Sequence, residues 1–191
     1  MKVTAFNGSS RKDGNTAFMI KQVFKELKKE NISTELIQFA DRDLSGCKAC
    51  RKCFEKQDNK CIIDKDDLNK YIQKMIKADG IIIASPTYFS NVTAEMKAFI
   101  DRAGYVGFAN GCLFKRKVGA AIGVARRAGA IHVFNSLNHF LFIQQMIIPG
   151  STYWNIGIGK DKGDVKEDSE GIKTMKNLGK NMAWTLKKIN R

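Results

Sequence analysis

The chain has 191 residues, of which 43% are hydrophobic and 27% are charged. This composition is typical of a globular protein with its own core, and we expect a single domain over residues 1–191. Two prolines and no low-complexity stretch argue against a long linker or a disordered region. The first residues lack the basic and apolar regions of a signal peptide, so we predict a cytoplasmic protein.

The formal net charge of +14 raises the possibility of nucleic-acid binding. However, the lysines and arginines do not gather in one arm or helix, and no known nucleic-acid-reading motif is present. A solvated, Lys-rich surface is therefore the preferred interpretation. A third interpretation is electrostatic attraction of an acidic redox partner.

Residues 128–158 contain no charged side chain and could be mistaken for a membrane span. Polar residues such as Asn138, His139 and Gln144 interrupt this stretch, so we expect no membrane-spanning helix. A helix buried in the core or in a subunit interface is the preferred interpretation.

Strand and helix patterns alternate along the whole chain. We expect strands at residues 2–6, 32–39, 80–85, 117–125 and 151–156, the last ended by Gly157 and Gly159. We expect helices at residues 16–29, 66–78, 93–102, 130–147 and 169–189, an irregular Cys-rich segment at 41–64 and a loop at 105–114. This alternation predicts an open parallel sheet with helices on both faces, whose ligands bind beyond the carboxyl ends of the strands.

The loop after the first strand, residues 8–16, has the composition of an anion site. It offers hydroxyl groups, an amide side chain and two glycines at the expected start of a helix. It lacks the motifs of triphosphate and dinucleotide sites, so a single phosphate monoester is the better candidate. The alternative is a turn that binds nothing, with Asn15 or Thr16 as the helix N-cap.

The loops after the third and fourth strands are also unusual. Residues 85–93 combine Tyr88 and Phe89 with hydroxyl and amide groups, which suits a flat heterocycle with polar edges. Residues 125–129 contain Arg126 and Arg127, which could donate to a ring carbonyl or an anion. The alternatives are aromatic rings that fill the core and a solvated pair of arginines.

Together, these loops resemble the NADPH-dependent FMN reductase branch of the flavodoxin-like proteins, and the similarity continues through residues 93–102, 153–155 and 168–171. The resemblance implies an α/β, doubly wound, five-stranded parallel sheet of order 2-1-3-4-5, with a Cys-rich insertion after the second strand. It also implies bound FMN. The phosphate would lie on the loop of residues 8–16 and the ring against the loop of residues 85–93, and residues 125–129 would form a third wall of the site. The cofactor-binding residues implied are Ser9, Ser10, Arg11, Gly14, Asn15, Thr16, Pro86, Thr87, Tyr88, Phe89, Ser90, Asn91, Ala125, Arg126 and Gly129. Ser10 departs from the proline that is often found there.

Four of the five cysteines lie close together in the sequence, at Cys47, Cys50, Cys53 and Cys61. Disulfides are a poor explanation in a cytoplasmic chain of this size. Zinc ribbons usually use two well-separated Cys-x-x-Cys pairs, whereas three cysteines at successive gaps of two residues are typical of one cubane cluster. A redox dithiol or an empty loop are the alternatives. We interpret the fifth, Cys112, as a lone structural thiol.

This compact motif resembles the iron–sulfur flavoproteins, a subgroup of the same family. The resemblance implies a [4Fe–4S] cluster on the four cysteines, within residues 41–64, and a homodimer or homotetramer with the cluster of one subunit near the flavin of another. Basic residues interleave the cysteines, which favours a reduced, more anionic cluster and would attract an acidic donor such as ferredoxin.

The predicted function is therefore electron transfer between the cluster and FMN, from ferredoxin to a small acceptor, with no catalytic acid or nucleophile. Three alternatives remain at this point. They are an NAD(P)H-dependent FMN, quinone or azo reductase without a cluster, a basic nucleic-acid-binding protein, and a zinc-stabilised module without catalytic activity.

Overall fold

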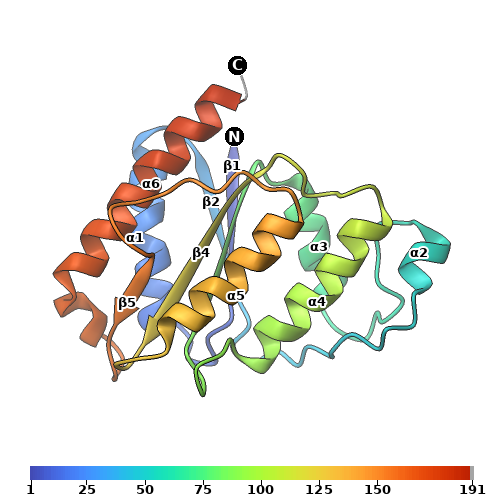
Figure 1. Cartoon of the computed structure of the whole chain (residues 1–191), viewed down its shortest axis with the longest axis horizontal. Coiled ribbons are helices and arrows are strands. Elements are labelled where there is room, and N and C mark those ends of the chain that lie inside the picture. Colours follow the sequence, from blue (N-terminus) through green and yellow to red (C-terminus); the bar gives the residue numbers. More distant parts are fainter. Residues whose placement is uncertain (190–191) are drawn as a thin grey trace.

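The structure is a computed structural model that describes residues 1–189. Its centre is a five-stranded parallel sheet of order β2-β1-β3-β4-β5, which confirms the predicted fold (Figure 1). The strands are β1 (Lys2–Asn7), β2 (Ser33–Gln38), β3 (Gly80–Pro86), β4 (Val118–Ala125) and β5 (Ile156–Ile158). The helices are α1 (Asn15–Lys29), α2 (Lys52–Lys56), α3 (Leu68–Lys77), α4 (Ala94–Ala109), α5 (Ala130–Ile143), the 3-10 helix η1 (Asp164–Glu167) and α6 (Ser169–Ile189).

Two hydrophobic cores hold the sheet between helical layers. Helices α1 and α6 cover one face, and α3, α4 and α5 cover the other (Figure 1). Strand β3 serves both cores, because Ile81 and Ile83 point to one face while Ile82 and Ala84 point to the other. A parallel strand buried on both faces needs such a continuous apolar run, and this is the pattern that predicts β3 from the sequence.

The prediction of the last strand at residues 151–156 is wrong, because β5 comprises Ile156–Ile158. The Ser151 hydroxyl lies 2.5 Å from the Tyr153 carbonyl oxygen and 2.6 Å from Asn155 Oδ1, and its one hydrogen can donate to either. Such local hydrogen bonding competes with strand pairing in the segment before β5. Gly157 lies within β5 and does not end it. A Cβ there would come within 2.6 Å of the Met19 side chain on α1 and 3.1 Å of Val165, so glycine leaves room for these side chains to pack against β5.

Helix α4 continues to Ala109, past the predicted end at residue 102 and into the predicted loop at 105–114. Two glycines of this part, Gly104 and Gly107, face α5 and its C-terminal end. A Cβ on Gly104 would lie 3.5 Å from the Phe140 ring, and one on Gly107 would lie 2.5 Å from Gln144 Oε1. Gly107 therefore lets α4 approach the C-terminal end of α5, whereas a Cβ at Gly104 would make only an ordinary van der Waals contact.

Helix α5 ends at Ile143, four residues before the predicted end. Gln145 has a φ of 58°, which is left-handed backbone that turns the chain out of the helix. Ile147 then pairs with Val118 beside the sheet. The irregular segment 41–64 also contains the short helix α2. None of the helices within residues 1–189 is both long and apolar enough to cross a membrane.

Candidate functional site

The first candidate site is a pocket of about 310 Å³ at the carboxyl ends of the strands. It lies where the loops after β1, β3, β4 and β5 meet, which is the ligand-binding edge of doubly wound sheets. Its lining residues are Ser9, Arg11, Asn15, Thr16, Pro86, Thr87, Tyr88, Val124, Ala125, Arg126, Gly159, Lys160 and Asp161.

The loop after β1 is held in shape by its own hydrogen bonds. The backbone N–H of Ser9 donates to Asn7 Oδ1 at 3.0 Å, and the Ser9 hydroxyl accepts from the Arg11 N–H at 3.1 Å. The N-cap of α1 is Gly14, with no side-chain cap hydrogen bond. The first N–H groups of α1, with the partial positive charge of the helix end, are therefore open to a ligand anion.

Asn15 has a different role from the N-cap considered above. Its side-chain amide donates to the Asp161 carbonyl oxygen at 2.8 Å and accepts from the Gly163 N–H at 2.8 Å. Arg11 Nη1 donates to the Lys160 carbonyl oxygen at 3.1 Å. These bonds fasten the loop after β5 to the loop after β1, so both walls of the pocket form one unit.

The loop after β3 contributes a polar atom that has no partner. Thr87 Oγ1 is buried and makes no hydrogen bond to any described residue, although Thr87 lines the pocket. A buried hydroxyl without a partner is costly unless a ligand satisfies it. Phe89 and Ser90 have φ values of 48° and 60°, which is uncommon for residues with side chains and frequent at ligand sites.

The pocket brings together nine of the fifteen predicted cofactor-binding residues. The six others, which lie in the same loops but do not line it, are Ser10, Gly14, Phe89, Ser90, Asn91 and Gly129. The prediction missed the wall formed by Gly159, Lys160 and Asp161. The prediction placed the ligand on the loops after the first, third and fourth strands alone, and the loop after the last strand was not considered.

The second candidate site is formed by the cysteines. Cys47, Cys50, Cys53 and Cys61 all line one small pocket, closed on its inner side by Arg102, Tyr105 and Val106 of α4. Cys47 and Cys50 are exposed, whereas Cys53 and Cys61 are half-buried against the core. Within residues 1–189, no three His, Cys, Asp or Glu side chains lie close enough together to hold a single metal ion.

The backbone of the cysteine loop curls around the pocket. Ala49 and Arg51 have φ values of 49° and 58°, and the Ala49 N–H donates to Cys47 Sγ at 3.4 Å. Helix α2 packs against α4, with the rings of Phe54 and Tyr105 in a T-shaped contact at 5.9 Å. This contact anchors the side of the loop that carries Cys53.

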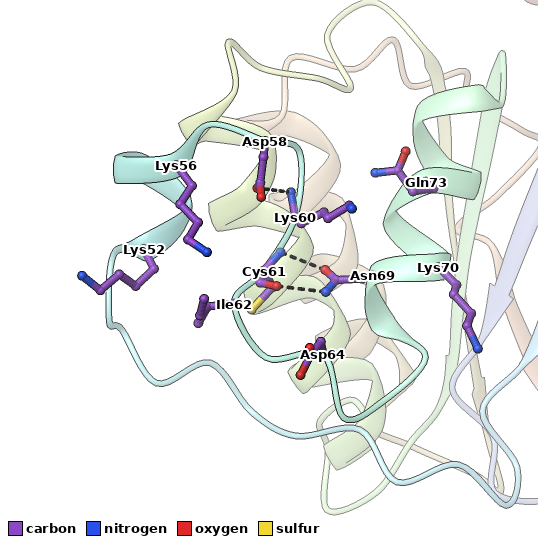
Figure 2. A pocket seen from close by; sticks show the side chains of 10 residues that line it. All are labelled: Lys52, Lys56, Asp58, Lys60, Cys61, Ile62, Asp64, Asn69, Lys70 and Gln73. Atoms are coloured by element: carbon purple, nitrogen blue, oxygen red, sulfur yellow. Dashed lines mark hydrogen bonds between the residues drawn. The ribbon is translucent and has the colours of Figure 1, made fainter.

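Two residues outside the motif fix the position of Cys61. Asn69 on α3 accepts from the Cys61 N–H at 2.8 Å and donates to the Cys61 carbonyl oxygen at 2.9 Å (Figure 2). Arg102 Nε donates to Cys61 Sγ at 3.3 Å. Asn69 was not singled out by the sequence, although it lies on the next long helix, eight residues after Cys61. Arg102 stood out only as part of a family motif, because it lies 41 residues from Cys61 in the chain.

Charges and burial act on the groups of this site. Burial raises the pKa of the Cys53 thiol, and the nearby Cys61 and Cys50 raise it further. Burial would also raise the pKa of Asp66, but the hydrogen bond from Arg102 and the N–H groups of Ser45 and Leu68 hold it below its ordinary value. Asp66 is therefore ionised and paired with Arg102 at neutral pH.

A third pocket, of about 440 Å³, opens beside Cys61 and is rimmed by lysines (Figure 2). Lys52, Lys56, Lys60 and Lys70 line it together with Asp58 and Asp64. Lys52 forms an ion pair with Glu55, and Lys70 forms one with Asp67. Cys61 lines both this pocket and the cysteine pocket, so its backbone separates the two.

Comparison with known proteins identifies the family. Residues 1–161 match the family model for NADPH-dependent FMN reductases. An iron–sulfur flavoprotein of Methanocaldococcus jannaschii is 36% identical over the full length of both chains. One of Methanosarcina thermophila is 32% identical and covers 100% of this chain and 98% of its own. The chain belongs to the iron–sulfur flavoproteins of the FMN reductase family.

A solved structure agrees with this assignment at the level of the fold. The structure of RosB with bound 8-demethyl-8-formylriboflavin-5′-phosphate has a TM-score of 0.81 at 18% sequence identity, covering 100% of this chain and 80% of that one. The family model and the relatives show that this iron–sulfur flavoprotein is an FMN-dependent oxidoreductase or electron-transfer protein. The names of its family and relatives imply two cofactors, FMN and an iron–sulfur cluster.

The residues present fit both groups. The open N-terminus of α1 and the unpartnered Thr87 hydroxyl suit a phosphorylated heterocycle. Four thiols line one pocket, and two of them accept N–H···S hydrogen bonds, from Ala49 and Arg102. In iron–sulfur proteins, hydrogen bonds to the cysteine sulfurs help to set the reduction potential.

Proposed function

We propose that this protein transfers electrons between a [4Fe–4S] cluster on Cys47, Cys50, Cys53 and Cys61 and FMN in the pocket at the carboxyl ends of the strands. The observation that supports the proposal most is the convergence of four thiols on one pocket, separate from the strand-end pocket. Residues 41–64 act as the cluster-binding loop of a single domain. A cluster passes one electron at a time and FMN accepts one or two, so the pair connects one-electron and two-electron chemistry.

In the strand-end pocket, the chain binds and orients the flavin. The N-terminus of α1, with Ser9, Arg11 and Thr16, holds the phosphate. The loop of residues 86–91 and the segment of Ala125, Arg126 and Gly129 hold the ring, where Thr87 offers a hydroxyl to a polar edge. No side chain needs to act as an acid or a nucleophile.

Gly129 provides a test of the flavin pocket. It has a φ of +85°, and a Cβ there would lie 2.7 Å from Ser90 Oγ. We expect Gly129→Ala to push the loop of residues 86–91 away and to raise the dissociation constant for FMN about tenfold, a cost of about 1.4 kcal/mol. Gly111→Ala is the matched control, since its φ is +77° but nothing lies within 4 Å. Equal FMN affinity of both variants, measured by flavin fluorescence, would place FMN elsewhere.

We propose that ferredoxin, or a similar acidic one-electron donor, docks at the lysine-rimmed pocket. Cys61 forms its wall, so this is a short route from the surface to the cluster (Figure 2). We expect Lys56→Glu with Lys60→Glu to slow the second-order rate of cluster reduction by about tenfold at low ionic strength, and less at high salt. Lys173→Glu with Lys176→Glu on α6 is the control, because it changes the net charge equally at another surface. Equal rates in stopped-flow experiments would exclude this docking site.

We also propose that the protein forms a homodimer or homotetramer. Phe142, Ile143, Tyr153 and Trp154, in the uncharged stretch, are 78%, 56%, 57% and 51% exposed, which is unusual for side chains of this kind in a monomer. The cysteine loop, which includes α2, lies at the end of the molecule opposite β5 and α6 (Figure 1). Assembly of subunits would bring the cluster of one close to the flavin of another. A monomer in analytical ultracentrifugation would contradict this proposal.

The experiment that tests the whole proposal is an anaerobic preparation assayed for FMN, iron, sulfide and zinc. We expect about one FMN, four iron and four sulfide per chain. The small acceptor is then sought by reoxidation of the ferredoxin-reduced protein. FMN without iron would indicate a simple NAD(P)H-dependent flavin or quinone reductase, and zinc in place of iron would make the cysteine loop a structural site.

A further inference from the structure

We propose that Arg102 is a positioning residue that sets the reduction potential of the iron–sulfur cluster through Cys61. This inference rests on the proposed function, since it requires the cluster to occupy the cysteine pocket. Arg102 lies on α4, 41 residues from Cys61 in the chain, and its Nε–H donates to Cys61 Sγ at 3.3 Å. Within residues 1–189, Arg102 Nε–H is the side-chain N–H group that donates a hydrogen bond to a sulfur of the four-cysteine motif.

The rest of the guanidinium group is held in place by the cysteine loop. Nη1 donates to the Ser45 carbonyl oxygen at 3.0 Å and to the Asp66 carboxylate, and Nη2 donates to the Ile63 carbonyl oxygen at 2.7 Å. These contacts come from both ends of the loop. Arg102 therefore fixes the loop around the pocket and fixes its own Nε–H toward the sulfur.

Burial makes this contact electrostatically strong. The side chains of Arg102 and Asp66 are 0% and 4% exposed, respectively. By contrast, Lys52, Lys56 and Lys60 are exposed, and solvent and salt screen their charges. A hydrogen bond or charge in a poorly solvated site acts at much greater strength.

The sign of the effect follows from the charge of the cluster. Reduction adds one electron and no proton to an already anionic group, and an N–H donor on a ligand sulfur stabilises the more negative state. The Asp66 carboxylate accepts from Nη1, whereas a different nitrogen, Nε, donates to Cys61. Asp66 therefore balances the buried charge of the guanidinium without taking the Nε–H from the sulfur. Arg102 thus raises the potential of the cluster and makes it a better acceptor from its donor.

The first test uses the wild-type protein, with arginine labelled with ¹⁵N at Nε alone. Pulsed paramagnetic resonance of the reduced cluster is expected to detect a ¹⁵N coupling transmitted through the N–H···S bond. The coupling is expected to persist in Arg51→Lys, which removes the other arginine of the cysteine pocket. A cluster signal without ¹⁵N coupling would overturn the inference, whereas the absence of any cluster signal would overturn the proposed function itself.

The second test is a redox titration of the Arg102→Gln, Asp66→Asn double variant. Both buried charges are removed together, so neither is left without its partner. We expect a lower midpoint potential for the cluster and an unchanged potential for FMN. The matched control is Arg42→Gln with Asp67→Asn, a more exposed ion pair that joins the start of the cysteine loop to the N-cap of α3, with no expected shift. Equal cluster potentials in the wild-type protein and the two double variants would show that Arg102 has a purely structural role and would overturn the inference. If the Arg102→Gln, Asp66→Asn variant does not load iron, the ¹⁵N experiment on the wild-type protein is the test that decides.

Discussion

Replacement of Cys53 by serine is expected to remove the iron–sulfur cluster and to leave FMN bound. Cys53 lies in α2, which packs on α4, and its sulfur lies against the core while lining the cysteine pocket. A hydroxyl group is a much poorer ligand for iron than a thiolate. Iron should fall from about four to less than one per chain, and ferredoxin-dependent reduction of the flavin should be lost.

Cys112→Ser provides the matched control for this experiment. Cys112 is half-buried, is also a free thiol and accepts a hydrogen bond from Gln145 Nε2 at 3.4 Å, but it does not line the cysteine pocket. This variant should keep its iron, its flavin and its activity. Retention of four iron atoms by Cys53→Ser would contradict the proposed ligand set, and loss of FMN together with iron would mean that the two sites do not form independently.

Replacement of Asp66 by asparagine is expected to lower the free energy of unfolding by about 3–5 kcal/mol. This change leaves the Arg102 guanidinium buried without its counter-ion, and removal of one partner of a buried ion pair is strongly destabilising. The measurement is urea unfolding of the anaerobic protein. The control is Asp67→Asn, whose partially exposed carboxylate pairs with exposed Lys70 and Arg42, and a change below about 1 kcal/mol is expected.

The cost of Asp66→Asn should depend on pH in a defined direction. Burial opposes ionisation of Asp66, but hydrogen bonds from Arg102 and two backbone N–H groups outweigh it and hold the pKa below the ordinary value of 3.8. A carboxylate with a lowered pKa contributes its full stability above its unfolded pKa and loses it as the pH falls through the folded pKa. The wild-type and variant proteins should therefore differ constantly above about pH 5 and converge below about pH 4. A difference that grew toward low pH would contradict an ionised Asp66.

The sequence by itself determined the class of fold and the two groups of residues that carry chemistry. A continuous apolar run such as Gly80–Pro86 can be recognised as a strand from the sequence, because a parallel strand buried on both faces needs such a run. The four cysteines are readable because spacing within a short loop is a local property. The same holds for the loop after the first strand, whose hydroxyls and glycines precede a helix.

Only the tertiary structure decided which other residues complete each site. Gly157 was predicted to end a strand, yet it lies inside β5, where it pairs with Val124 and where Met19 of α1 packs beside it. Asn15 reads as a helix cap, yet it holds a loop nearly 150 residues further along the chain. Arg102 reads as one charge on a helix, and its contact with Cys61 appears only when α4 is placed beside the cysteine loop. Such contacts depend on the packing of distant elements, and no local pattern in the sequence records which side chains that packing brings together.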